Sequence, residues 1–179
     1  MFTGIVRERA PVRSLEDGRL VVEARTPAAI GDSVAIDGVC LTVVGNEGAL
    51  AFDVVEETLR RVKPFGAEVN VEPALRAGDP MGGHLMQGHV DGVGRVRSTG
   101  GDLTWIDPPP ELLRYCVEKG SIAVDGVSLT IAALDETGFA VALVPHTREI
   151  TTLGALAPGD PFNLEIDILA KYVERLAIQ

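Results

Sequence analysis

The stretch of sequence that decides the fold occurs twice, as Asp32-Ser-Val-Ala-Ile-Asp-Gly-Val-Cys-Leu-Thr42 and as Gly120-Ser-Ile-Ala-Val-Asp-Gly-Val-Ser-Leu-Thr130. The copies stand 88 positions apart in a chain of 179 residues. In each copy, two short β-branched apolar runs flank an Asp-Gly pair, which suits a tight connection between strands. The duplication therefore predicts two tandem domains of about 85 residues, each near the lower end of usual domain sizes.

The repeat extends beyond this stretch on both sides. Gly4-Ile5-Val6 matches Gly92-Val93-Gly94 at the same spacing, and Asn70-Val71-Glu72 matches Asn163-Leu164-Glu165 after small insertions. A glycine-rich stretch over residues 77–88 has the composition of a linker or a close-approach loop. We therefore expect three parts, at residues 1–84, 85–166 and 167–179.

Short apolar segments separated by turn residues predict an all-β fold. In the first half they are residues 20–24, 33–36, 40–44, 50–55 and 69–72. Strands at this spacing are typical of an antiparallel barrel or a sandwich. Two segments have helical spacing instead, residues 110–120 and residues 167–176. The second is amphipathic, so it must cover either its own barrel or the same helix of another copy.

Composition excludes several classes of function. The net charge is −10 and there is no basic run, so nucleic acid is not an expected partner. No apolar run approaches the roughly 18 residues of a membrane span, and the chain starts without the features of a secretory signal. With two cysteines, Cys40 and Cys116, we expect free thiols in a soluble, cytoplasmic protein.

Cys40 and Ser128 occupy equivalent positions of the repeat, so one scaffold presents two different nucleophile-capable atoms. This asymmetry suggests divided labour between the halves, although both residues could instead be small strand residues that pack a barrel. Cys116 lies on the apolar face of the predicted 110–120 helix, and we assign it to the core.

Two histidines, His84 and His89, lie in or beside the glycine-rich junction. Imidazole beside flexible backbone suits acid–base chemistry near neutral pH, but both could equally be polar linker residues. No cluster of Cys or carboxylate residues with zinc spacing accompanies them, so no metal is expected. The glycines lack the Gly-Lys-Ser/Thr ending of a phosphate loop, which disfavours nucleotide hydrolysis.

Several motifs in fixed order identify a family. They are Met1-Phe-Thr-Gly-Ile-Val6, Asp37-Gly-Val-Cys-Leu-Thr42, Gly82-Gly-His-Leu-Met-Gln-Gly-His89, Asp125-Gly-Val-Ser-Leu-Thr130, Pro145-His-Thr147 with Thr151-Thr-Leu-Gly154, and Asn163-Leu-Glu-Ile-Asp167. Together they closely resemble the riboflavin synthase α-chain family from Met1 to Leu176. The resemblance implies two six-stranded Greek-key antiparallel barrels and a C-terminal helix that assembles a homotrimer.

The resemblance also implies an activity that needs no cofactor. Two molecules of 6,7-dimethyl-8-ribityllumazine exchange a four-carbon unit, which gives riboflavin and 5-amino-6-(D-ribitylamino)uracil. In the family each barrel binds one lumazine, and the working site pairs the N-terminal barrel of one subunit with the C-terminal barrel of a neighbour. An association with lumazine synthase stays open.

By resemblance, site residues are carried over position by position. The first-barrel pocket would contain Ser33, Cys40, Leu41, Thr42, Gly4, Ile5, Val6, Asp53, Val54, Val55, Glu56, Glu57 and Thr58, reached by Gly88, His89 and Val90. The second-barrel pocket would contain Lys119, Ser128, Leu129, Thr130, Val144, Pro145, His146, Thr147, Arg148, Glu149 and Asp167. Among these, Cys40, Ser33, His89, Thr130 and Asp167 are the catalytic candidates.

The expected chemistry starts with loss of a proton from the C7 methyl group of one lumazine, with His89 or Thr130 handling the proton. Water, Ser33 or Cys40 would add at C7 of the second lumazine. Two alternatives remain open at this point. One is a lumazine- or flavin-binding protein of the same fold without activity, and the other is a structural barrel whose helix only oligomerises.

Overall fold

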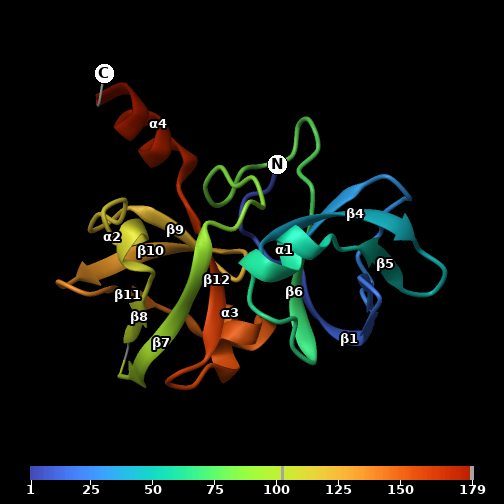
Figure 1. The fold of residues 1–179 in the computed structure, drawn as a ribbon, viewed down its shortest axis with the longest axis horizontal. Helices are drawn as coiled ribbons and strands as arrows, with labels where there is room; N and C mark the ends of the chain where they lie inside the picture. The colour runs from blue at the N-terminus through green and yellow to red at the C-terminus, as the bar shows by residue number, and fades with distance from the viewer. Residues whose placement is uncertain (102, 178–179) are drawn as a thin grey trace.

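The computed structural model describes residues 1–101 and 103–177, so the last two residues of the predicted C-terminal segment, 178–179, lie outside the described residues. Two barrels lie side by side (Figure 1). The first consists of β1 (Glu8–Glu16), β2 (Arg19–Val22), β3 (Ser33–Ile36), β4 (Val39–Gly45), β5 (Leu50–Asp53), α1 (Glu56–Arg61) and β6 (Glu68–Pro73). Its strands close in the order β1-β2-β5-β4-β3-β6.

The second barrel repeats this arrangement. Its elements are β7 (Gly92–Gly100), β8 (Leu103–Asp107), α2 (Pro110–Leu113), β9 (Ser121–Val124), β10 (Val127–Leu134), β11 (Phe139–Ala142), α3 (Pro145–Ile150), η1 (Thr152–Ala155) and β12 (Pro161–Ile166). The strands close in the order β10-β11-β8-β7-β12-β9, and all neighbours in both barrels are antiparallel. The predicted tandem all-β barrel fold is confirmed.

Each barrel closes around its own apolar core. In β3 and β4, side chains alternate between the interior and the outer surface, because successive residues of a strand point to opposite faces. Val34 and Leu41 are buried in the first core, whereas Ala35 and Cys40 belong to a separate cluster between the barrels. Cys116 is buried in the core of the second barrel, as predicted.

The Asp-Gly pairs form the tight hairpins that the repeat predicts. Asp37 and Gly38 have φ of +47° and +79°, and Asp125 and Gly126 have φ of +45° and +77°. Two consecutive positive φ values are what a type I′ turn requires. The two turns meet back to back, since a Cβ on Gly38 would lie 2.7 Å from the backbone nitrogen of Gly126.

The predicted helix over residues 110–120 is wrong in extent, because α2 ends at Leu113. The segment turns after Cys116, and Lys119, at φ +67°, directs its N–H to the carbonyl of Ile131 as the chain enters β9. Tertiary pairing thus replaces the last turns of the helix.

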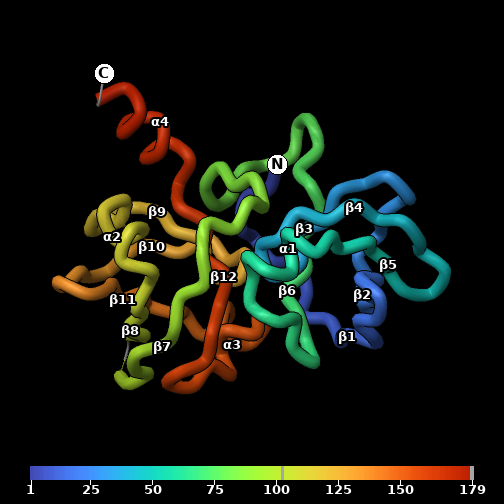
Figure 2. Tube along the Cα trace, viewed as in Figure 1, coloured from blue at the N-terminus to red at the C-terminus, as the bar shows by residue number. Residues whose placement is uncertain are grey.

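A small apolar layer joins the barrels. Phe2 and Met86 exchange two backbone hydrogen bonds of 2.8 and 3.1 Å, and their side chains pack between Ala35 and Ala123. The start of the chain therefore runs beside the junction segment, as the blue and green traces show (Figure 2).

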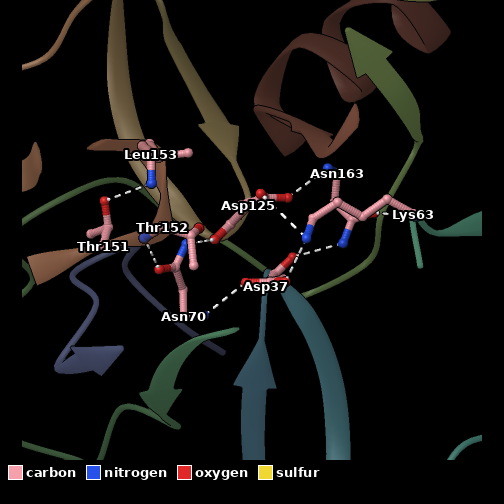
Figure 3. Close-up of polar contacts among 8 residues, drawn as sticks. All are labelled: Asp37, Lys63, Asn70, Asp125, Thr151, Thr152, Leu153 and Asn163. Atoms are coloured by element: carbon pink, nitrogen blue, oxygen red, sulfur yellow. Dashed lines mark hydrogen bonds and ion pairs between the residues drawn. The ribbon is translucent and has the colours of Figure 1, made fainter. Parts of the chain in front are cut away.

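A buried polar cluster crosses the same interface (Figure 3). Asn70 donates to the carbonyl of Asp125 and Asn163 donates to the carbonyl of Asp37, each at 2.9 Å. Lys63 Nζ lies 2.7 Å from Asp37 and 3.6 Å from Asp125, so one ammonium faces a carboxylate from each barrel. The turn of each barrel is thus hydrogen-bonded to the last strand of the other.

Burial raises the pKa of Asp125 well above its usual range, and it raises that of Asp37 as well, while Lys63 opposes both shifts. For Lys63, burial alone would lower the pKa, but the two carboxylates raise it above its ordinary value. The cluster is therefore one cation held between two buried acids.

The last described element is α4 (Ile168–Ala177), which projects beyond the second barrel (Figure 1). It contacts that barrel on one side, where Glu174 pairs with Arg114 and Lys171 pairs with Asp91. No residue of α4 is buried. No helix among residues 1–101 and 103–177 is long and apolar enough to cross a membrane.

Candidate active site

A cavity of about 160 Å³ opens on the outer face of the first barrel. It is lined by Val39, Cys40, Thr58, Arg61, Val62, Gly88, His89 and Val90. A thiol, an imidazole, a hydroxyl and a guanidinium thus converge on one hollow, which is the composition expected of a small-molecule site.

A larger cavity, of about 340 Å³, opens on the second barrel. It is lined by Gly4, Ile5, Val6, Arg7, Val127, Ser128, His146, Thr147, Ile150 and Thr151. Hydroxyl groups and apolar side chains dominate here, so this cavity suits binding of a flat ring with polar substituents.

The two cavities occupy equivalent positions in the two barrels, as a matching pair of backbone hydrogen bonds shows. Cys40 N donates to the carbonyl of Gly88 at 2.8 Å, and Ser128 N donates to the carbonyl of Gly4 at 2.9 Å. Residues 1–7, which we name the first lead-in segment, therefore correspond to residues 85–91, the second lead-in segment. Under this correspondence, His89 of the first cavity stands where the second cavity has Ile5.

The two lead-in segments are exchanged between the barrels. The first precedes β1 but lines the cavity of the second barrel, and the second precedes β7 but lines the cavity of the first. The assignment of Gly4, Ile5 and Val6 to the first-barrel pocket is thus wrong, as is their match to residues 92–94. The strand pairing gives the correct offset, since Glu8 opposes Val71 as Gly92 opposes Leu164.

Two buried glutamates fix the lead-in segments. Glu72 accepts hydrogen bonds from Thr3 N at 2.8 Å and Gly4 N at 3.0 Å. Glu165 accepts from Gln87 N at 2.6 Å and Gly88 N at 2.9 Å. Burial raises the pKa of both carboxyls, and these N–H donors oppose that shift. Each glutamate belongs to the last strand of one barrel and holds the backbone beside the other barrel's cavity.

Glycine is required where the lead-in segments meet the barrels. A Cβ on Gly4 would lie 2.5 Å from Ser128 Cβ, and a Cβ on Gly88 would lie 2.6 Å from Cys40 Cβ. Both glycines also have positive φ, of +76° and +77°. Only glycine allows this approach in this conformation.

Several predicted site residues come together in these cavities. Cys40, Thr58, Gly88, His89 and Val90 line the first cavity. Gly4, Ile5, Val6, Ser128, His146 and Thr147 line the second. The structure thus groups a thiol with an imidazole on one barrel and a hydroxyl with an imidazole on the other.

Other predicted residues lie elsewhere. Ser33 lines a separate hollow of about 120 Å³ beside Pro73 and Arg76, so the structure does not bring it into the cavity of Cys40. Leu41 and Val54 are buried in the first core, and Leu129 packs against the second. The remaining exposed or half-exposed residues outside both cavities are Thr42, Asp53, Val55, Glu56, Glu57, Lys119, Thr130, Val144, Pro145, Arg148, Glu149 and Asp167.

The sequence interpretation missed some lining residues, which are Val39, Arg61, Val62, Arg7, Val127, Ile150 and Thr151. The repeat contained the signal for most of them. Val39 and Val127 directly precede Cys40 and Ser128, and Arg61 and Ile150 share the spacing that relates Thr58 to Thr147.

The side chains that line the two cavities can form hydrogen bonds and exchange protons. Among residues 1–101 and 103–177, no group of three or more His, Cys, Asp or Glu side chains is placed to hold a metal ion. Hydroxyl, thiol and imidazole groups are the ones suited to nucleophilic and acid–base steps.

The family model described as "Lumazine binding domain" matches twice, at residues 3–74 and 87–167. The riboflavin synthase of Mycobacterium tuberculosis is 45% identical over 197 residues, which cover 98% of each chain. That of Chlamydia pneumoniae is 41% identical, over 96% of this chain and 92% of its own. That of Actinobacillus pleuropneumoniae is 36% identical, over 100% and 91%.

Among solved structures, LumP complexed with riboflavin superimposes with a TM-score of 0.81 at 23% identity, over 93% of this chain and 99% of that chain. LumP complexed with 6,7-dimethyl-8-(1'-D-ribityl) lumazine gives a TM-score of 0.77 at 22% identity, over 92% and 98%. These likenesses support the double-barrel fold. From the family match over both halves and the identities of 36–45% over nearly the full length, the chain belongs to the riboflavin synthase α-chain family.

Proposed function

We propose that the chain is a riboflavin synthase, which transfers a four-carbon unit between two molecules of 6,7-dimethyl-8-ribityllumazine and releases riboflavin and 5-amino-6-(D-ribitylamino)uracil. The observation that carries the proposal is the pair of equivalent but chemically different cavities. Two copies of one substrate in different roles need two related sites. The relatives named riboflavin synthase favour this activity over the binding-only alternative.

The geometry favours Cys40 and His89 as the catalytic pair. They line one cavity, whereas Ser33 lies in a separate hollow and Thr130 lies outside both cavities. The His89 imidazole would take a proton from the C7 methyl group of one lumazine, which leaves a carbanion stabilised by the ring. The Cys40 thiol would add at C7 of the other, so that this carbon becomes tetrahedral while the ring accepts the electron pair of the C7 double bond and the thiol proton.

The activity can be tested with the purified protein, lumazine and no added cofactor. We expect one riboflavin for every two lumazines consumed, followed by the absorbance of riboflavin. Tight lumazine binding without riboflavin would place the chain with the binding-only proteins of this fold instead.

Cys40→Ser and His89→Ala are each expected to lower kcat by about 100-fold, the usual contribution of a positioned acid–base or nucleophilic group. The matched control is Cys116→Ala. Burial raises the pKa of the Cys116 thiol to about 11 and it lines neither cavity, so turnover should persist. Unchanged turnover in both site variants would show that the assignment is wrong.

We also infer that the chain forms a homotrimer through α4, and that it works in the cytoplasm, where its two thiols stay reduced. The helix leaves a continuous apolar face uncovered, made of Leu169, Tyr172, Val173 and Leu176, each 58–71% exposed. A cavity of about 420 Å³ runs between this helix and Tyr115 and Val117. A contiguous exposed apolar face is typical of an interaction site.

A trimer would also bring the two kinds of cavity together. Within one chain the two cavities have no lining residue in common among those described, and the Phe2–Met86 layer lies between the barrels. Carbon transfer requires the two lumazines to be in contact. Pairing the first cavity of one copy with the second cavity of its neighbour would meet this requirement.

Val173→Asp is therefore expected to convert the trimer into monomers, as measured by sedimentation velocity. Turnover should be lost while each chain still binds lumazine, because its own cavities are intact. Arg175→Ala, on the same helix, should leave the trimer and its activity unchanged. A trimeric and active Val173→Asp protein would contradict the assembly.

A further inference from the structure

His84, on the linker between the barrels, reaches the second barrel with its side chain. Its Nδ1 lies 2.7 Å from Ser128 Oγ, and its backbone N–H donates to the carbonyl of Thr3 at 3.1 Å. The preceding Gly83 packs so closely that a Cβ there would lie 1.9 Å from the Thr3 oxygen and 2.9 Å from Ser128 Cβ. The linker backbone thus holds the imidazole against Ser128.

Ser128 stands between this imidazole and the second cavity. Ser128 lines the cavity, whereas His84 is not among the residues that line it. The imidazole therefore acts on a ligand in this cavity through the Ser128 hydroxyl, to which it is hydrogen-bonded.

We propose that His84 is a positioning residue that fixes the Ser128 hydroxyl for the ligand in the second cavity. A serine hydroxyl has one donor and two acceptor positions, and it rotates to suit its neighbours. The hydrogen bond to Nδ1 occupies one of these positions and stops the rotation. The remaining positions are then presented to the ligand in a fixed direction.

The surroundings of the ring suit this role. Burial lowers the pKa of His84, and the negative charge of Asp167 opposes the shift only in part. A neutral ring offers one donor and one acceptor, and either can engage a hydroxyl. Nε2 is buried without a hydrogen-bonding partner among the described residues, so Ser128 is the side chain to which the ring is hydrogen-bonded.

The hydrogen bond between His84 and Ser128 also distinguishes the second barrel from the first. The equivalent position of the first barrel carries Cys40, whose thiol is a weak hydrogen-bond donor and acceptor. A hydrogen-bonded serine suits orientation of a bound ring, while a thiol suits addition to one. The inference rests on the proposed function in taking lumazine as the ligand of both cavities.

A double-mutant cycle tests the inference, with kcat, KM and lumazine affinity measured for each variant. His84→Ala is expected to lower kcat/KM and lumazine affinity by about fivefold, the effect of one hydrogen bond between neutral groups. In a Ser128→Ala background the same change should have no further effect. His84→Asn, whose amide can replace Nδ1, should restore kcat/KM to within about twofold.

Met81→Ala, an exposed linker residue, controls for a general disturbance of the linker and should behave as the unmodified protein. The inference is overturned if His84→Ala has no effect, or if its effect is equally large with and without Ser128. If His84→Ala does not fold, His84→Leu fills the same space without a hydrogen bond and takes its place. If the unmodified protein makes no riboflavin, the proposed function fails, and the cycle in lumazine affinity still decides the role of His84.

Discussion

Replacing Lys63 with methionine is expected to lower the free energy of unfolding by about 3–5 kcal/mol. Methionine keeps most of the volume of the side chain but removes the ammonium group that faces Asp37 and Asp125. Two buried carboxylates, one from each barrel, then lie together without a cation. Such a loss is far larger than that of a surface ion pair, because neither carboxylate can regain water.

The loss in free energy of unfolding caused by Lys63→Met, which we call its deficit, should increase with pH. Burial raises the pKa of Asp125 and Asp37, and removal of Lys63 raises both further in the folded state. A carboxyl whose pKa is higher in the folded state stabilises the fold below its unfolded pKa, and this contribution is lost as pH rises through the folded pKa. The deficit should therefore be smaller near pH 5 than near pH 8.

Urea denaturation at the two pH values measures both effects. Arg9→Met is the matched control, because Arg9 pairs with Glu68 at 3.3 Å on the exposed surface of the first barrel. This change should alter the free energy of unfolding by at most about 1 kcal/mol. Equal deficits for the two variants would mean that the cluster does not join the barrels as described.

Gly88→Ala is expected to lower kcat by at least about 100-fold, the usual effect of moving a reacting group by about 1 Å. The new methyl group would lie 2.6 Å from Cys40 Cβ and 2.8 Å from Cys40 N. The second lead-in segment must then move away from β4, and His89 moves with it. The loss follows from displacement of the imidazole from the thiol.

Gly48→Ala separates this effect from backbone strain. Gly48 has φ +76°, nearly the +77° of Gly88, but nothing lies within 4 Å of a Cβ placed there. Both variants strain the backbone by about 1–2 kcal/mol, and Gly88→Ala should lose more stability in urea because its methyl group also meets Cys40. Only Gly88→Ala should lose turnover, and similar kcat values for the two variants would refute the role of the close approach.

The duplicated stretch was enough to predict two similar domains, because its Asp-Gly turns specify the same hairpin twice, and the family resemblance implied that each domain is a barrel. It could not indicate β1, whose sequence Glu8-Arg-Ala-Pro-Val-Arg-Ser-Leu-Glu16 buries only Ala10. Pairing with β2 and β6, and not apolar patterning, makes this segment a strand. The sequence also did not predict the short helices α1 and α3. Each has six residues, which is too short for a recognisable helical pattern of apolar residues.

Only part of the candidate site could be predicted from the sequence. Cys40, Ser128 and His89 followed from the repeat and the family motifs, and each lies in a cavity. The place of the first lead-in segment did not follow, because sequence order assigns it to the barrel that it precedes. The contact between Lys63 and the two Asp-Gly turns was equally hidden, since it depends on how the barrels face each other.

The exchange of the lead-in segments determines how the protein can be divided. Each half contributes an arm to the opposite half, as in a dimer whose subunits swap their N-terminal arms, and one linker makes that dimer a single chain. A half expressed alone would keep its arm but leave its own cavity without a wall. The point of division decides the outcome, because every lining residue of the first cavity lies within residues 39–90. A fragment that ends after residue 91 therefore keeps the walls of that cavity. The second cavity needs residues 4–7, so it is completed by the whole chain or by a circular permutant that places residues 1–7 after the second half.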